Sequence, residues 1–256
     1  MIPETLSPSR INCYMSCSMQ YFFRYIEKVP SQKNLALAFG SAVHLTLQKN
    51  YSQKMQTKRD LPIDEIKDSF SDNYDTETAD VSRKEIIDAN TSEGSVKDNG
   101  IHLIKLYHQQ ISPRIQPTAV EQKLEASFKN FPTKLNGIVD LADVNGVVID
   151  HKTTTRRQQM PEKYKIQVGI YKVLKQARGD QISDCRIDWL IRKANPEIVH
   201  VEVIPDVNFA LRMFQMVCAG IEKEVFIPNR DSMLCTRRFC AYWPQCQAKV
   251  GGTVKD

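Results

Sequence analysis

The pattern of apolar and polar residues changes character about halfway along the chain. In the first half, apolar residues recur with helical spacing over 7–26, 38–54 and 100–111. Residues 61–100 are instead rich in Asp, Ser and Thr, and we expect a weakly packed helical insertion there. Ser7 or Ser9 suits the cap of the first helix, because Pro8 fits its first turn.

The second half alternates between apolar and polar positions, as strands do. Strands are expected over 119–131 and within 135–155, a hairpin over 185–204, and helices over 162–177 and 206–226. Helices followed by a mostly antiparallel sheet, with further helices between its strands, predict an α/β fold. We expect one domain over residues 1–256, because no internal repeat is visible.

The turn at Asn145 and Gly146 decides how two acids on the flanking strands face each other. If these two residues form a type I′ turn, Asp140 pairs with His151. Asp140 and Asp150 then point to opposite faces of the sheet, because side chains alternate along a strand.

A three-residue loop over 144–146 gives the other register. Such a loop is a type I turn closed by glycine in the left-handed region, and it pairs Asp143 with Val147. Asp143 suits the first position of a type I turn. Asp140 then lies directly across from Asp150, and their Cβ atoms are about 4.5–5.5 Å apart.

Like charges in that position are destabilising, and a divalent cation between the two carboxylates would offset their repulsion. Lys152 lies on the same side of its strand as Asp150. Two hard oxygen ligands and a lysine suit a site that polarises a phosphate and activates water. The alternative is that both acids face solvent and Lys152 pairs with one of them.

Composition bounds the class of protein. The chain of 256 residues is 41% hydrophobic and 25% charged, as ordinary soluble globular proteins are. Its net charge of +5 permits a polyanionic partner but does not argue for one. The opening MIPETLSPSR lacks the blocks of a secretion signal, and no apolar run reaches the length of a membrane span. We therefore expect a cytoplasmic protein without a membrane partner.

Six short motifs occur in one order along the chain. They are SPSRINCYMSC, FGSAVH, GIVD, IDHK, QVGIY and CTRRFCAYWPQC, and they span residues 7–246. In this order they resemble the RecB-like branch of the PD-(D/E)XK nucleases, and are similar to CRISPR-associated RecB-like iron–sulphur exonucleases and their viral relatives. The resemblance implies a restriction-endonuclease-like core with a mixed, largely antiparallel central sheet flanked by helices. It also implies a helical N-terminal region and a C-terminal cysteine cluster.

The resemblance also implies site residues. The ligands it implies for Mg²⁺ or Mn²⁺ are His44, Asp140, Asp150 and the backbone carbonyl of His151. Lys152 would position or deprotonate the attacking water and stabilise charge on the phosphate. Gln167 and Tyr171 would share one face of a helix and contact the substrate or the site, as further catalytic residues. Glu121 and Glu125, on the preceding strand, are looser candidates that we leave unassigned.

Seven cysteines, without a secretion signal, argue against a disulfide framework. Cys235, Cys240 and Cys246 are close enough in sequence for one loop to present three thiolates to one centre. With a fourth ligand they suit zinc or an iron–sulphur cluster. Structural zinc sites generally use paired Cys-x-x-Cys motifs, which this chain lacks.

The resemblance favours a four-iron, four-sulphur cluster in an iron–sulphur region formed by 13–17 and 235–246. It implies Cys17 as the fourth ligand, and Cys13, one helical turn earlier, is the alternative. Cys185 and Cys218 lie in strand and helix patterns, and we expect them to be buried and unligated.

The function implied by the resemblance is a metal-dependent DNA exonuclease that hydrolyses phosphodiester bonds near strand ends. The expected settings are recombination, repair, replication or CRISPR adaptation. DNA that is single-stranded or has a free end is the expected partner, with protein partners in a recombination or adaptation complex. The alternatives are a non-catalytic DNA-binding or adaptor protein that retains the fold, and a zinc-stabilised binding module. Asp140, Asp150 and Lys152 together count against a non-catalytic protein.

Overall fold

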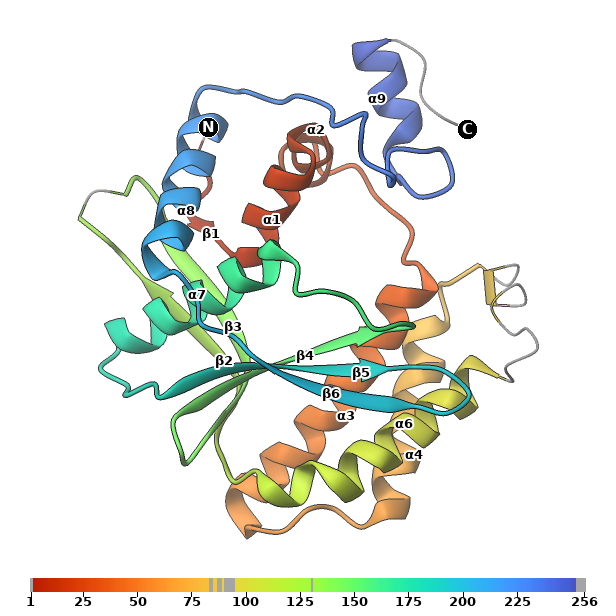
Figure 1. Ribbon diagram of the computed structural model, residues 1–256. Helices are drawn as coiled ribbons and strands as arrows, with labels where there is room; N and C mark the ends of the chain where they lie inside the picture. Colours follow the sequence, from red (N-terminus) through yellow and green to blue (C-terminus); the bar gives the residue numbers. More distant parts are fainter. Residues whose placement is uncertain (1, 83–84, 87–88, 90–94, 130, 252–256) are drawn as a thin grey trace.

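The computed structural model describes residues 2–82, 85–86, 89, 95–129 and 131–251. At the centre of this part of the chain is a mixed six-stranded sheet (Figure 1). Its strands are β1 (Thr5–Leu6), β2 (Pro117–Ala126), β3 (Lys134–Asp143), β4 (Val147–Thr154), β5 (Asp184–Ile191) and β6 (Glu197–Glu202). The pairs β1–β3 and β4–β5 are parallel, and the other three are antiparallel. The mixed, largely antiparallel sheet expected from the sequence is confirmed.

Helices cover both faces of the sheet (Figure 1). One face carries α1 (Pro8–Ser16), α7 (Glu162–Ala177) and α8 (Val207–Glu222), and the other carries α3 (Leu35–Thr57), α4 (Ile63–Thr78) and α6 (Val96–Gln110). The short helices α2 (Ser18–Tyr21) and α9 (Trp243–Val250) lie beside the first group. Each face has its own apolar core, so the α/β fold with a helix-flanked sheet is confirmed. Within the described residues, every helix is too short or too polar to cross a bilayer.

Strand β3 has three neighbours, and two of them share one of its edges. β2 pairs along the whole of one edge. On the other edge, β4 pairs with residues 141–142 and β1 with residues 134–135. Between these two stretches the edge has no ladder pair among the described residues, and the sheet opens there beside Asp140. The fold thus provides a gap at the place where the motif acids lie.

The β3–β4 hairpin has the register of the three-residue loop over 144–146. Leu141 pairs with Ile149, which places Asp140 and Asp150 at opposed positions of the two strands. The alternative with a two-residue turn is therefore wrong.

Asp143 holds this turn with its side chain. Its Oδ1 accepts hydrogen bonds from the backbone N–H groups of Asn145 at 2.9 Å and Val147 at 3.0 Å. Gly146 closes the loop at φ 77°, a left-handed conformation that glycine adopts without strain. The turn is therefore specified locally, and it sets the register of both acids.

The first predicted helix, over 7–26, is broken at Cys17. Ser7 caps α1, but Cys17 is extended at φ −164° and separates α1 from α2. Residues 22–26 follow as a π-helical turn. Contacts from a distant segment stabilise the break, because Ser18 Oγ donates to the Ile227 carbonyl at 3.1 Å and accepts from its N–H at 2.7 Å. Sequence periodicity cannot register a partner 209 residues away.

The expected weak packing of the 61–100 segment is wrong for α4. Its residues Ile66, Phe70 and Tyr74 are buried, and the Phe70 ring lies 5.7 Å from that of Phe39 in α3. A spacing of four residues places them on one face, and one apolar stripe packs a helix whose composition is otherwise polar. The parts of the predicted insertion at 83–84, 87–88 and 90–94, and of the predicted domain at 1 and 252–256, lie outside the described residues.

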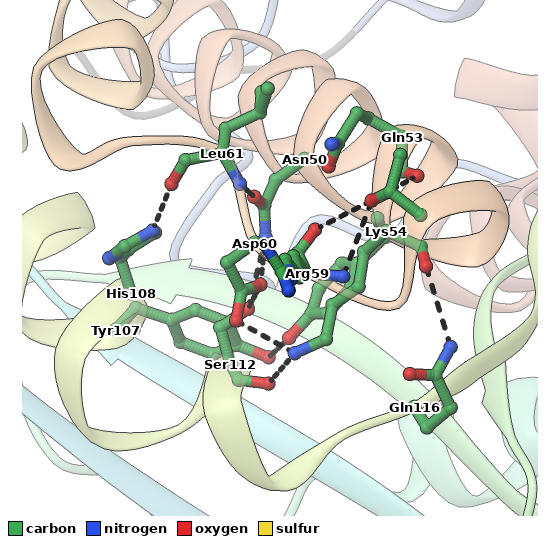
Figure 2. A network of polar contacts seen from close by, with 12 residues as sticks. Asn50, Gln53, Lys54, Arg59, Asp60, Leu61, Tyr107, His108, Ser112 and Gln116 are labelled. Carbon is green, nitrogen blue, oxygen red and sulfur yellow. Dashed lines mark hydrogen bonds and ion pairs between the residues drawn. The ribbon is translucent and has the colours of Figure 1, made fainter.

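A buried polar network ties the second half of α3 to the end of α6 (Figure 2). Lys54 is only 4% exposed and donates to Asp60 Oδ2 and to the Ser112 carbonyl, both at 2.7 Å. Asn50 donates to Asp60 at 2.7 Å and to Ser112 Oγ at 3.0 Å. A buried charge with these partners is stable only in one arrangement, so the network fixes two helices that both reach the site described below.

Candidate active site

Asp150 and Lys152 form an ion pair on β4, at the gap in the sheet. Asp150 is fully buried, and its Oδ2 lies 2.7 Å from Lys152 Nζ. Its Oδ1 accepts a hydrogen bond from Gln167 Nε2 at 3.1 Å. Apart from the lysine contact, Oδ2 receives no hydrogen bond from the described residues. A buried carboxylate oxygen with spare acceptor capacity fits a ligand for a cation.

Burial acts in opposite directions on the two members of this pair. Burial raises the pKa of Asp150; Lys152 opposes this and the nearby Asp140 carboxylate adds to it. Burial lowers the pKa of Lys152, but the two carboxylates outweigh burial and hold that pKa above its ordinary value. Lys152 is therefore an ammonium, the form that stabilises negative charge on a phosphate. A cation beside Asp150 would favour its ionised form.

Asp140, on β3, contacts β4 and helix α3 through its carboxylate. Its Oδ2 accepts a hydrogen bond from the backbone N–H of His151 at 2.8 Å. The same oxygen lies 3.5 Å from His44 Nδ1 and 3.7 Å from His151 Nδ1. One ligand atom from each of these three residues lies within 4.8 Å of the others. Two imidazoles and a carboxylate at this spacing suit a divalent transition metal.

Two glycines of the motifs allow the helices to reach the strands. A Cβ on Gly40 would lie 3.2 Å from Thr153 Oγ1, so its absence lets α3 approach β4 one helical turn before His44. A Cβ on Gly137 would lie 3.1 Å from the Tyr171 ring, so α7 packs closely on β3. The glycines of the Gly-x-x-x-His and Gly-x-x-Asp motifs thus set the distance between helix and sheet.

The two histidines have opposite electrostatic surroundings. Burial lowers the pKa of His44, but Asp140 and the contact with Glu121 outweigh it and raise the value to about 9. For His151, burial is the largest effect and lowers the pKa to about 4. His151 is therefore a neutral imidazole, and His44 is charged until a metal displaces its proton.

Glu121 lies in this site and Glu125 does not. The Glu121 Oε1 atom is 3.8 Å from His44 Nδ1, whereas Glu125 pairs with Lys134 at 2.8 Å. The backbone of Glu121 has φ 45°, in the left-handed region, within strand β2. Such a conformation costs a non-glycine residue free energy and is common at functional sites. Alternation along the strand could not separate the two glutamates, because a spacing of four residues places both on one face of a regular strand.

Gln167 and Tyr171 support Asp150 from helix α7. Gln167 Nε2 donates both to Asp150 Oδ1 and to the Tyr171 hydroxyl, the latter at 2.7 Å. Tyr171 is 4% exposed, and burial raises its pKa well above the ordinary value. The sequence led us to expect that Gln167 and Tyr171 contact either the substrate or the active site. In the structure they contact the active site, Gln167 directly and Tyr171 through Gln167.

Four of the cysteines line one small pocket between α2 and α9, together with Phe23 and Tyr242. They are Cys17, Cys235, Cys240 and Cys246. The sequence expectation that these four lie together agrees with this placement.

The other three cysteines lie elsewhere. Cys13 packs against the core beneath α1, and burial raises its pKa to about 11. Cys185 and Cys218 are 2% and 1% exposed, and burial raises the pKa of each to about 11. Protonated, buried thiols fit the structural role expected for Cys185 and Cys218.

The helix-flanked mixed sheet, with two acids and a lysine at its gap, is the core of a restriction-endonuclease-like nuclease. The chain belongs to the PD-(D/E)XK nuclease superfamily, which it matches over residues 5–247. Among curated proteins, none matches this chain.

A solved structure shows the same fold. A crystal structure described as a "Putative exonuclease" from Eubacterium rectale has a TM-score of 0.64 at 14% identity. The match covers 98% of this chain and 94% of that one. A crystal structure of SSO0001 matches with a TM-score of 0.39 at 13% identity, over 94% and 96% of the two chains.

The structure brings most of the predicted site residues to one place. They are His44, Asp140, Asp150, Lys152 and Gln167, with Tyr171 behind Gln167. The ring of His151 was not among the predictions, which used only its backbone carbonyl. Tyr107 and Asp188, next to that ring, were also missed. One signal was available, because Asp188 interrupts the apolar run of a buried strand.

Proposed function

We propose that this protein is a divalent-metal-dependent deoxyribonuclease that acts as an exonuclease near strand ends. The observation that carries the proposal is the placement of Asp150, paired with Lys152, next to the Asp140 and His44 group. A copy of the fold that only binds DNA has no chemical reason to keep a buried carboxylate oxygen whose one polar contact among the described residues is a lysine.

The metal would be held by His44, Asp140 and Asp150, with the His151 carbonyl as the further ligand implied by the family resemblance. A bound Mg²⁺ or Mn²⁺ supplies Lewis acidity at the phosphate and a more acidic water. Lys152, as an ammonium, orients that water and neutralises charge on the phosphate oxygens. Gln167 fixes the orientation of Asp150 through its hydrogen bond to Oδ1. Because Lys152 is already protonated, its role is charge stabilisation rather than removal of a proton from the attacking water.

We also propose that Cys17, Cys235, Cys240 and Cys246 hold a four-iron, four-sulphur cluster. The four side chains line one pocket, and the chain lacks the paired Cys-x-x-Cys motifs that structural zinc sites generally use. The cluster would join the N-terminal helices to the segment that carries α9. Its role is structural, because the metal-binding free energy stabilises the fold.

The test is cleavage of end-labelled single- and double-stranded DNA with Mg²⁺, with Mn²⁺ and with EDTA. We expect mononucleotides or short products released from an end, only with metal, and no cleavage of circular single strands. DNA binding without cleavage under all metal conditions would favour the adaptor alternative. Rapid cleavage of the circles would contradict the exonuclease assignment and retain the nuclease.

A further inference from the structure

A chain of buried polar groups leads away from the candidate metal centre. His151 Nε2 lies 2.9 Å from the Tyr107 hydroxyl, which lies 3.2 Å from Asp188 Oδ2. The exposed fractions are 2% for His151 and 0% for Tyr107 and Asp188. Groups buried to this degree must satisfy one another, so the direction of each hydrogen bond can be worked out.

Asp188 is the acceptor that fixes the direction. Its Oδ1 lies 2.8 Å from Arg186 Nε and 2.6 Å from His200 Nδ1, and its Oδ2 lies 3.2 Å from a terminal nitrogen of Arg186. A fully buried carboxylate beside a guanidinium is ionised, and an ionised carboxylate can only accept. The bond between Tyr107 and Asp188 is therefore donated by the tyrosine.

Tyr107 has one hydrogen, and this bond uses it. The Tyr51 hydroxyl donates a hydrogen bond to the Tyr107 oxygen at 3.2 Å. Tyr51 is therefore not an acceptor for the Tyr107 hydrogen. The remaining contact of the Tyr107 oxygen, with His151 Nε2, must be donated by the histidine. His151 is thereby held in the tautomer with hydrogen on Nε2 and a lone pair on Nδ1.

The surroundings of His151 Nδ1 lead to the same conclusion. Its nearest carboxylate oxygen is Asp140 Oδ2, at 3.7 Å. That distance is too long for a hydrogen bond, so an N–H at Nδ1 would be buried without a partner. A lone pair there instead points into the group formed with His44 and Asp140.

We propose that Asp188, acting through Tyr107, positions His151 so that its ring Nδ1 is a metal ligand beside His44 and Asp140. Carboxylates commonly orient a metal-bound histidine in this way, and here a tyrosine is interposed. The inference rests on the proposed function only in requiring a divalent metal at this centre. It gives the ring of His151 a role separate from that of its backbone carbonyl.

The first measurement uses the metal-free chain of 256 residues. Nitrogen NMR of ¹⁵N-labelled histidine should show His151 with hydrogen on Nε2. Asp188→Asn should reverse the direction of these hydrogen bonds, because an amide can donate to Tyr107, which then donates to His151. The hydrogen of His151 should then move from Nε2 to Nδ1. Tyr51→Phe is the matched control, since it removes a hydroxyl that touches Tyr107 but leaves the bonds to Asp188 and His151. It should leave the tautomer unchanged.

The second measurement adds Mn²⁺ and counts ligand nitrogens by pulsed electron paramagnetic resonance. The parent should show two imidazoles, and His44→Ala and His151→Asn should show one each. Tyr107→Phe should weaken Mn²⁺ binding about tenfold, whereas Tyr51→Phe should not. If Tyr107→Phe does not fold, Asp188→Asn replaces it in the binding measurement.

Hydrogen on Nδ1 in the parent, or a nitrogen count that His151→Asn leaves unchanged, would overturn this inference while DNA cleavage could still stand. Two imidazoles on Mn²⁺ without any DNA cleavage would support the inference and contradict the proposed function. Failure to bind Mn²⁺ at this centre would overturn both.

Discussion

Asp140 on β3 accepts a hydrogen bond from the backbone N–H of His151 on β4, at 2.8 Å. This side-chain bond lies where the β3–β4 ladder ends, beyond the pair Leu141–Ile149. The carboxylate therefore holds the two strands together at the point where they begin to separate. Asp140 is tied to the strand that carries Asp150 without any metal, which preorganises the site.

The first prediction concerns the buried ion pair. Asp150→Asn and Lys152→Met should each lower DNA cleavage by at least about a hundredfold, because the first removes a metal ligand and the second removes the positive charge that stabilises the phosphate. DNA affinity should change little, since phosphate contacts elsewhere supply most of it. The matched control is the exposed pair Asp64 and Lys67, 2.8 Å apart, changed in the same way. Near-normal cleavage in both site variants would remove the assignment of this site.

The second prediction is a preference for Mn²⁺ over Mg²⁺, with Ca²⁺ supporting DNA binding only. Imidazole nitrogen is a better ligand for Mn²⁺ than for Mg²⁺, which prefers oxygen. His44→Ala should therefore lower the ratio of Mn²⁺-dependent to Mg²⁺-dependent cleavage. Initial rates at saturating metal measure this ratio. An unchanged ratio in the variant would contradict the role of His44.

The third prediction uses the left-handed backbone of Glu121. Glu121→Gly should raise the free energy of unfolding by about 1 kcal/mol, because glycine adopts this conformation without strain. The same change should lower cleavage, because it removes the carboxylate beside His44. Glu125→Gly is the control in the same strand and should be destabilising, without a specific loss of cleavage. Urea unfolding and initial rates of cleavage measure the two effects. A Glu121→Gly variant with a lower free energy of unfolding would contradict the idea that the Glu121 backbone is strained.

The fourth prediction is loss of stability in acid. The folded pKa of His151, about 4, lies below its ordinary value of 6.5. Between these values the unfolded chain binds more protons, so stability falls as the pH drops from 6.5 towards 4. The loss should approach about 3 kcal/mol. His151→Asn should remove this part of the pH dependence in urea unfolding with EDTA, and the exposed His102→Asn should not. Parallel curves for the parent and His151→Asn would argue against the buried neutral ring.

The fifth prediction concerns the cysteine pocket. Protein purified without oxygen should be brown, and serine at Cys17 or at any of the three C-terminal cysteines should bleach it and lower its melting temperature. Cys185→Ser and Cys218→Ser are the matched controls and should stay brown. Bleaching by Cys13→Ser but not by Cys17→Ser would move the ligand by one helical turn. Stoichiometric zinc without iron would exclude the cluster and leave the nuclease assignment intact.

The parts of the site that sequence could predict are those set by local patterns. Asp143 and Gly146 determine the turn, and the turn determines that Asp140 opposes Asp150. The parts that it could not predict depend on distant partners. The break at Cys17 is stabilised from residues 227–229, and Glu121 differs from Glu125 in its left-handed backbone and its position beside His44.

The network behind His151 was missed for the same physical reason. Tyr107, on α6, and Asp188, on β5, meet only because the sheet and the second helical layer bring them together. Each is an ordinary residue in its own segment. A buried acid within an apolar strand is the single local sign that a partner must exist.

Residues 225–246 provide the surface on which the N-terminal helices rest. Tyr14 donates to the Val225 carbonyl at 2.6 Å, and Met19 and Phe23 pack with Tyr242. A ribosome adds about 5–20 residues per second, so the interval between making Phe23 and making Tyr242 is on the order of tens of seconds. The segment that carries Phe23 is thus synthesised long before the residues that cover it, and it is among the last to be packed. A nascent chain arrested before Tyr242 carries those apolar side chains uncovered.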